Sequence, residues 1–311
     1  MFVNSAAQDR PIGIALAAYE PPIEFLRAQL QSIAEQSDTH WFCVITLDSP
    51  LASLRQRPEL LPFFLDPRFR WFENPERLGV ARNFARAFRL ALESGAWAIA
   101  PSDQDDLWYP QKLAVLRREL AKRPPLALVH SDMDLLTGEH VETESGWQQA
   151  KRDVNRASPE ELLIWNIATG AAMLIDARLV EKYPEIPTGV RYHDHFYAVA
   201  ASLHGGAHPV LERLYAYRQH ANNVIGAQTY RGLLGGQRLE TLYKNRADAV
   251  KNFESMRAVG RAFAKEAPEL ARLVDSGDGG ARLFFYGLKS LGYKSLARES
   301  FALSFGKLFG R

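Results

Sequence analysis

The residues best suited to chemistry lie in one short acidic stretch, Asp103-Gln104-Asp105-Asp106. It follows an apolar run over residues 96–100, which is typical of a buried strand, and it precedes a helical pattern that opens at Pro110. Open α/β sheets bind ligands in the crevice beyond the carboxyl ends of their strands. The spacing lets the oxygens of Asp103 and Asp105 converge while Asp106 points elsewhere. Two hard oxygen ligands suit Mg²⁺ or Mn²⁺, although a solvated acidic turn would read the same way.

A second set of candidate residues lies further along the chain. His193-Asp194-His195 opens an apolar helical pattern, and adjacent side chains on a helix point in different directions, so the three cannot all face one ion. Asp194 therefore fits a general base supported by its neighbours, with a helix N-cap as the alternative. Arg218 and His220 end a strand-like segment. An arginine and a histidine there suit a diphosphate and the completion of a metal's shell.

The elements that would position the acidic stretch begin with a βαβ unit. Residues 12–18 read as a buried strand, residues 23–35 as an amphipathic helix, and residues 42–47 as a second strand that delivers Asp48. A proline-rich loop with short helical turns covers residues 50–68, and residues 70–72 form a short strand. A helix starts at Gly79 with Arg82 and Asn83 in its first turn, where unpaired N–H groups favour a phosphate. Arg82 could equally be a solvated first-turn residue.

The second half of the chain shows a less regular pattern. A short strand over residues 126–129 leads into Asp132 and Asp134, which we interpret as a polar strand end and turn, with acceptor contact as the lesser alternative. Residues 138–157 resemble a loop over a site, and Ser158 begins a helix through a capping box. Residues 169–175 read as a strand opened by a glycine that allows close backbone approach. Helical patterns follow over residues 239–264 and 268–274.

Composition narrows the class of protein. The 311 residues include 38 Lys+Arg against 36 Asp+Glu, so no global field favours a nucleic-acid partner. The single cysteine, Cys43, lies in an apolar run and excludes an internal disulfide or a cysteine-based zinc site. We expect neither a signal peptide nor a membrane span, which favours a cytoplasmic protein. The basic and apolar tail, residues 281–311, could contact the inner face of the plasma membrane peripherally or dock on the preceding domain.

Taken together, these motifs resemble family-two inverting glycosyltransferases of the GT-A fold, and in particular the bacterial rhamnosyltransferase-like branch. Five segments appear in the family's order and approximate spacing: the acidic DXD motif extended to residues 102–113, residues 78–84, Thr169-Gly170, residues 193–196 and residues 217–223. The resemblance implies an α/β fold whose mixed, mostly parallel sheet is flanked by helices. It also implies a catalytic domain over residues 1–226, with a nucleotide-binding half at about 10–125 and an acceptor-binding half at about 126–226. Residues 227–311 would form a helical C-terminal extension.

The same resemblance implies roles for individual residues. Asp105 would hold Mn²⁺ or Mg²⁺, with His220 completing metal or diphosphate binding, and Asp194 would be the catalytic base. The nucleotide-diphosphate sugar, a dTDP or UDP donor, would contact Tyr19, Asp48, Arg82, Asn83, Asp103 and Arg218. The glycan or lipid-linked acceptor would lie near Trp108, Thr169, Gly170 and His193. The implied activity is transfer of a sugar, with rhamnose as the candidate, in bacterial surface polysaccharide synthesis.

One segment departs from the family pattern. The family usually carries two acids and a glycine after the second strand, whereas this chain reads Leu47-Asp48-Ser49-Pro50, and Glu20 stands where asparagine is common. This leaves the choice between dTDP and UDP open. It also favours one alternative of a different class, a non-catalytic partner that binds a sugar nucleotide or glycan within an assembly complex. A nucleotidyltransferase is a weaker option, because no glycine-rich phosphate loop lies near the first strand.

Overall fold

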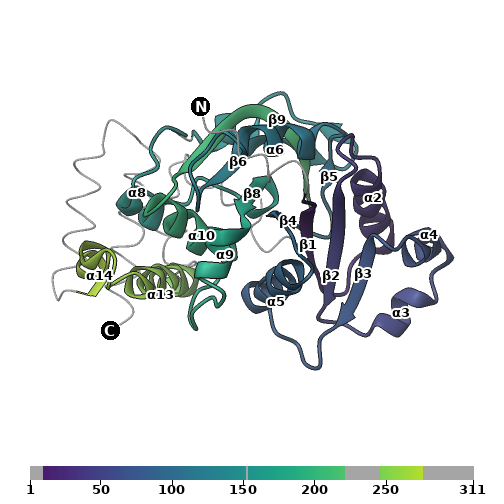
Figure 1. Cartoon of the computed structure of the whole chain (residues 1–311), viewed down its shortest axis with the longest axis horizontal. Helices are drawn as coiled ribbons and strands as arrows, with labels where there is room; N and C mark the ends of the chain where they lie inside the picture. Colours follow the sequence, from purple (N-terminus) through teal and green to yellow (C-terminus); the bar gives the residue numbers. More distant parts are fainter. Residues whose placement is uncertain (1–9, 152, 221–245, 276–311) are drawn as a thin grey trace.

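A computed structural model describes residues 10–151, 153–220 and 246–275. Its centre is one sheet, in which the described strands follow the order β3-β2-β1-β4-β8-β6-β9-β5, with β7 paired to β6 (Figure 1). The strands are β1 (Ile12–Ala18), β2 (Trp41–Leu47), β3 (Phe69–Glu73), β4 (Ala98–Ser102), β5 (Leu107–Trp108), β6 (Leu128–Thr137), β7 (His140–Val141), β8 (Met173–Asp176) and β9 (Ala207–Gln219).

The direction of the strands decides where functional side chains can meet. Strands β1, β2, β3 and β4 are mutually parallel. Strand β8 is antiparallel to both β4 and β6, so β6 runs in the same direction as β4, and β9 is parallel to β6. The carboxyl ends of β1, β2, β4, β6 and β9 therefore share one edge of the sheet, as ligand binding in an open α/β fold requires.

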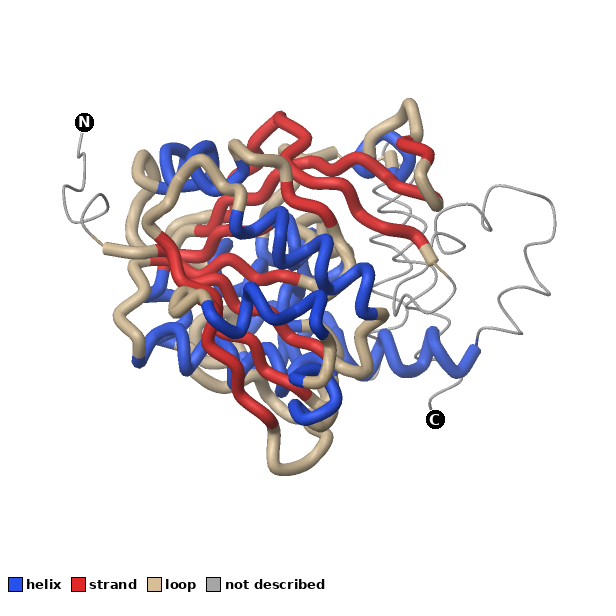
Figure 2. The backbone as a smooth tube through the Cα atoms, turned by 90° about the vertical axis from the view of Figure 1, so that its right-hand side faces the viewer, coloured by secondary structure: helices blue, strands red, loops and turns tan. Residues whose placement is uncertain are grey.

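Helices cover both faces of the sheet (Figure 2). One apolar core joins the sheet to α5, α8, α9, α10, α13 and α14, and the other joins it to α2, α3, α4 and α6. Adjacent residues of β1 alternate between the cores, with Ile14 in the second and Ala15 in the first, as the period of a strand requires. The helices are α2 (Ile23–Ala34), α3 (Leu51–Arg55), α4 (Leu61–Leu65), α5 (Val80–Glu93), α6 (Lys112–Leu120), α7 (Gly146–Ala150), α8 (Pro159–Ile164), α9 (Ala177–Lys182), α10 (His193–Ser202), α13 (Arg246–Ala262) and α14 (Pro268–Asp275), with short 3-10 turns η1 (Pro58–Leu60) and η2 (Gly170–Ala172).

Local sequence signals explain several helix starts. Helix α5 begins after Gly79, whose φ of 78° lies in the left-handed region that favours glycine. Helix α8 begins at the expected capping box, in which Ser158 and Glu161 satisfy each other's backbone N–H groups. These two starts are confirmed, and so are the short helical turns within residues 50–68.

Three expectations from the sequence were wrong. Strand pairing between distant segments and a helix cap within the loop determine the structure there. The strand expected at residues 126–129 continues to Thr137, since β9 pairs with it beyond Ser131, so Asp132 and Asp134 lie within a strand and not in a turn. The loop expected at residues 138–157 contains β7 and α7, and Ser145 caps α7. The strand expected from residue 169 begins only at Met173, because Gly170–Ala172 form η2.

The described part of the C-terminal extension packs onto the sheet domain. Phe253, Met256 and Val259 of α13, Phe263 directly after it and Leu270 of α14 are buried in the core that contains α8 and α10. Figure 1 shows these helices at the opposite end of the molecule from α2 and α4. The tail at residues 281–311, for which we expect membrane contact or docking, lies outside the described residues. Among those that are described, no helix is long and apolar enough to cross a membrane.

Candidate functional site

The centre of the site is a contact between the acidic stretch and the end of β9. Asp105, just beyond β4, accepts a hydrogen bond at Oδ2 from His220 Nε2 at 2.7 Å, across 115 residues of sequence. Arg218 reinforces this junction, because its Nε donates to the Asp105 carbonyl at 2.9 Å and its backbone N–H donates to Asp106 Oδ1 at 3.2 Å. Phe25 of α2 lies beside both side chains, with its ring 4.4 Å from the Arg218 guanidinium and 5.6 Å from the His220 ring.

The structure gathers carboxyl groups around this contact. Burial raises the pKa of Asp103, and the neighbouring charges of Asp105 and Asp194 raise it further. Burial also raises the pKa of Asp106, whose Oδ2 is enclosed without a hydrogen-bond partner among the described residues. Asp103 thus lies within electrostatic reach of both Asp105 and Asp194. Asp106 accepts a hydrogen bond from the β9 backbone.

Asp194 occupies the first turn of α10 and is not its N-cap, which is Tyr192. Its Oδ2 accepts a hydrogen bond from the Gly170 N–H at 3.1 Å, and its Oδ1 accepts one from the His195 N–H at 2.6 Å. Glycine at residue 170 avoids a clash, because a Cβ there would lie 2.6 Å from His193 Nε2 and that ring would have to shift. The backbone of η2 therefore approaches closely enough to hold the Asp194 carboxylate.

A buried lysine, Lys112, connects the acidic stretch at residues 103–106 to the turn η2 beside Asp194. Lys112, the first residue of α6, is fully buried, and its Nζ lies 3.8 Å from the centre of the Trp108 ring and 4.5 Å from that of Tyr215. It donates to the Ala171 carbonyl in η2. Burial lowers the pKa of Lys112, whereas the charges of Asp106 and Asp103 raise it. Lys112 therefore partly neutralises the acidic cluster and ties it to the turn that holds Asp194.

The residues expected on the nucleotide side divide into two groups. Asn83 is buried and reaches the carbonyl groups of Ala18 and Thr46 at 3.4 and 3.3 Å, so it joins the ends of β1 and β2. Asp48 accepts three hydrogen bonds from within the chain, from Asn74 Nδ2, Leu78 N and Gly79 N at 2.6 to 3.0 Å. Both residues shape the edge of the sheet through their own polar contacts.

Tyr19 and Arg82 are more accessible. Tyr19 is 37% exposed, its N–H donates to Gln104 Oε1 at 2.9 Å, and the Arg77 guanidinium lies 3.8 Å above its ring. Arg82 is exposed and lies 3.9 Å from the Glu76 carboxylate. Tyr19 is thus partly accessible at the end of β1, with one face of its ring covered by Arg77.

The residues expected on the acceptor side lie at different depths. Thr169 and Gly170 form the turn beside Asp194. Trp108 is buried beneath Lys112, and His193 is buried with its ring 3.8 Å from that of Phe84 and 5.6 Å from that of Phe88. The structure thus places Trp108 and His193 in the packing that supports the site.

Sequence reasoning gave no role to several residues that shape the site. Lys112 stands inside the motif that carries the resemblance, but a lysine at a helix start would ordinarily be solvated. Gln104 holds the Tyr19 backbone, and Asn74 connects Asp48 to Asn83 through a 2.8 Å hydrogen bond. Two signals were available in the sequence: Gln104 is the polar residue between Asp103 and Asp105, and Asn74 is the polar residue directly after β3.

The side chains present fit a divalent cation in part. Among the residues that the structure describes, no cluster of three or more His, Cys, Asp or Glu side chains surrounds a single point. Asp105 and His220 nevertheless bring one carboxylate and one imidazole together, next to further carboxylates whose mutual repulsion a cation would relieve. Mg²⁺ and Mn²⁺ sites often use only one or two protein groups and fill the remaining positions with water and substrate phosphates.

Comparisons with known proteins support the fold. No protein-family profile and no curated protein sequence matches the chain. Among solved structures, S. aureus TarS 1-349 in complex with UDP aligns with a TM-score of 0.55 and 11% identity over 96% of this chain and 90% of that one. The mannosyltransferase PcManGT from Pyrobaculum calidifontis, in complex with GDP-Man and Mn²⁺, aligns with a TM-score of 0.55 and 17% identity over 98% and 88%. These neighbours are GT-A-type glycosyltransferases, and the chain has the GT-A fold.

We expect the two histidines beside Asp194 to make stability depend on pH. Burial lowers the pKa of His193 to about 3 and that of His195 to about 4, against about 6.5 in an unfolded chain. Because the folded state keeps both rings neutral, their contribution is complete above about pH 6.5 and is lost as the pH falls toward 4, at up to about 1.4 kcal/mol per pH unit for each ring. The raised pKa values of Asp103 and Asp106 act in the opposite sense over this range, so the measurement is the difference in urea unfolding free energy between the wild type and His193→Leu from pH 7.5 to 5. The slope of unfolding free energy against pH should be less positive in the variant than in the wild type. An unchanged slope in that variant would contradict the assignment.

Replacing Lys112 should destabilise the protein through the acidic cluster. Lys112→Met keeps the length of the side chain but leaves the buried carboxylates uncompensated and the Ala171 carbonyl unpaired, so we expect a loss of about 3 kcal/mol in unfolding free energy. Lys122→Met, an exposed lysine paired with Glu119, is the control and should change little.

A double variant separates charge from packing. If the Lys112 ammonium acts by compensating Asp106, adding Asp106→Asn to Lys112→Met should recover much of the lost stability in denaturant titrations. Additive losses in the double variant, or a Lys112→Met protein as stable as the wild type, would show that the charge has no such role.

Proposed function

We propose that this protein is a metal-dependent inverting glycosyltransferase. It would move a sugar, with rhamnose as the candidate, from a nucleotide-diphosphate donor to a hydroxyl of a glycan or lipid-linked acceptor in bacterial surface polysaccharide synthesis. The observation that carries the proposal is the contact between Asp105 and His220 beside Asp103 and Asp194. That arrangement offers both diphosphate binding and proton removal at one edge of a GT-A sheet. The nucleotide sugars bound to the structural neighbours, UDP-GlcNAc and GDP-Man, are consistent with such a donor.

The donor would lie between the ends of β1, β4 and β9. Asp105 and His220 would hold Mn²⁺ or Mg²⁺, which when bound would neutralise the diphosphate and make it a better leaving group. Arg218 would contact the diphosphate, Asp103 the ribose or the metal's shell, and Tyr19 the base. Because the Asp48 carboxylate already accepts three hydrogen bonds, a base that contacts it would have to share those donors or replace them.

Asp194 would act as the general base. In this scheme Asp194 takes the proton from the acceptor hydroxyl as that oxygen bonds to the anomeric carbon. The bond from that carbon to the diphosphate breaks on the opposite face, so the configuration inverts and the nucleoside diphosphate leaves. The N–H groups of Gly170 and His195 orient the Asp194 carboxylate, since both donate to it and fix its position relative to η2.

A non-catalytic sugar-nucleotide-binding role is the second candidate, and one observation favours it. The full hydrogen bonding of Asp48 leaves the segment after β2 unlike an open base-binding loop. Slow metal-dependent hydrolysis of a donor would distinguish the candidates, because a binding partner would retain the donor without releasing nucleoside diphosphate.

Asp194→Asn should remove the base while leaving the fold and the donor site intact. We expect transfer to fall by about 10² to 10⁴, with donor affinity close to that of the wild type. The assay is release of nucleoside diphosphate in the presence of acceptor, and Asp66→Asn, which alters a pair with Arg68 outside the site, is the control. Full transfer activity in Asp194→Asn would exclude this residue as the base.

A further inference from the structure

A recess lies outside the carboxylate cluster, between β6, α7 and the first half of β9. Its volume is about 370 Å³, which is within the range of about 300 to 1,000 Å³ typical of small-molecule sites. The side chains that line it and matter here are Asp132, Gln148, Lys151 and Arg213. Arg213 lies on β9, and His220 directly follows that strand seven residues later, or about 23 Å along an extended strand, so the recess is separate from the proposed donor site.

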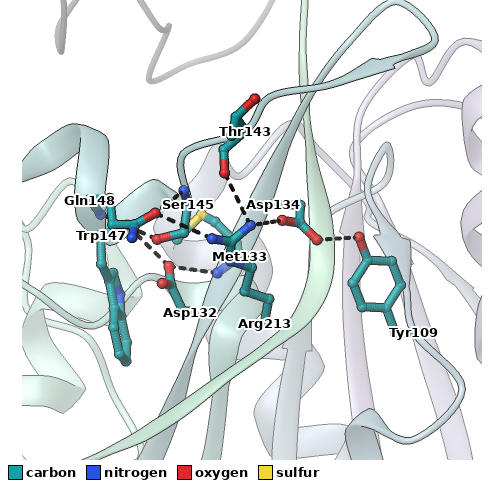
Figure 3. Close-up of polar contacts among 9 residues, drawn as sticks. All are labelled: Tyr109, Asp132, Met133, Asp134, Thr143, Ser145, Trp147, Gln148 and Arg213. Carbon is teal, nitrogen blue, oxygen red and sulfur yellow. Dashed lines mark hydrogen bonds and ion pairs between the residues drawn. The ribbon is translucent and has the colours of Figure 1, made fainter.

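Arg213 is held in a fixed orientation by three groups (Figure 3). Its Nη1 donates to Asp134 Oδ1 at 2.9 Å and to the Thr143 carbonyl at 3.4 Å, and its Nη2 donates to Gln148 Oε1 at 3.2 Å. Asp134 is itself positioned by the Tyr109 hydroxyl, which donates to its Oδ2 at 2.6 Å. The guanidinium is therefore oriented before any ligand arrives, which lowers the entropic cost of binding.

The guanidinium keeps donor capacity toward the recess. Its Nε meets no acceptor among the residues that the structure describes, and the Arg213 side chain is 37% exposed despite its ion pair. Lys151 adds a second cation to the lining. A planar guanidinium with an available edge suits the two oxygens of a carboxylate or phosphate group.

The remaining lining groups suit hydroxyls. Gln148 offers an amide, and Asp132 offers a carboxylate whose Oδ1 already accepts from the Met133 and Trp147 N–H groups. Because Asp134 pairs with Arg213, the formal charges at the recess balance, and an anionic group would bind through the remaining N–H groups of Arg213 and through Lys151, while Gln148 and Asp132 would contact the hydroxyls of a polyhydroxylated ligand.

We propose that this recess binds an acidic sugar unit of the acceptor, with its carboxylate on Arg213 and Lys151 and its hydroxyls on Gln148 and Asp132. The acceptor part of this inference rests on the proposed function, whereas the binding itself does not. The recess lies on the half of the chain that we expect to bind acceptor, and Tyr109 joins it to the segment that carries the acidic stretch. An acidic acceptor glycan would then extend along β9 from the site of transfer.

The experiment measures binding of D-glucuronate to the full chain by saturation-transfer NMR, with D-glucose as the comparison ligand and inorganic phosphate as a competitor. We expect saturable glucuronate binding, weaker binding of glucose, and a loss of about tenfold or more in affinity in Arg213→Gln, since a charged hydrogen-bonding partner is removed. Lys151→Gln, which removes the second cation of the lining at an exposed position, should also weaken binding. Arg118→Gln, an exposed arginine paired with Glu212, should bind like the wild type.

Each result decides the proposal. Equal binding of glucuronate and glucose, or wild-type affinity in both Arg213→Gln and Lys151→Gln, would overturn it. Phosphate that displaces glucuronate at equal concentration would overturn the sugar part and show a simple anion site. Glucuronate binding in Asp105→Ala would confirm that the recess is independent of the donor site, so that a failure of the proposed transfer reaction would be recognised separately.

Discussion

The structure depends on holding several carboxylates together at one edge of the sheet. Asp103, Asp105, Asp106 and Asp194 lie close enough that burial and mutual repulsion raise the pKa of Asp103 and Asp106. Three groups of the surrounding chain stabilise these carboxylates: the Lys112 ammonium, the Arg218 backbone N–H and the His220 imidazole. A cluster of this kind is costly in an empty site and becomes favourable when a cation and a diphosphate bind, so part of the stability of the protein should be supplied by its ligands.

The sheet topology explains why the cluster forms at this place. Because β4, β6 and β9 run in the same direction, the acidic stretch and the end of β9 arrive at one edge even though 115 residues separate Asp105 from His220. The α10 helix adds Asp194 from a third segment, and η2 connects that residue to Lys112. Four segments distant in sequence therefore meet around a single edge of the sheet.

Much of the fold could be predicted from the sequence, because local signals were strong where local energetics decide. The apolar runs of β1 and β2, the capping box of α8 and the glycine before α5 each determine an element within a few residues. The extent of β6 could not be predicted in this way, since its second half is a strand only because β9 pairs with it. The burial of Lys112 was equally hidden, because the carboxylates that retain it lie elsewhere in the chain.

The site was predicted less evenly than the fold. The spacing of Asp103 and Asp105 predicted a cation site, and the residue types at the end of a strand predicted that His220 could complete it. The family resemblance placed the two predictions in one site. Neither could show that Asp48 would be occupied by the N–H groups of Leu78 and Gly79, because that contact depends on how the loop before α5 returns to the end of β2. Such contacts within loops bear directly on nucleotide choice, which is therefore the least predictable property of the chain.

The most direct test of the central claim is a thermal-shift panel of UDP, dTDP and GDP, each with and without Mn²⁺ or Mg²⁺. A ligand that binds only the folded state raises its stability, by about 2.7 kcal/mol at a concentration 100 times its dissociation constant. We predict a metal-dependent rise in Tm with one nucleotide, lost in Asp105→Ala and retained in Asp66→Ala. No rise with any nucleotide, or an equal rise in Asp105→Ala, would contradict a metal-assisted nucleotide-sugar site at the junction of Asp105 and His220.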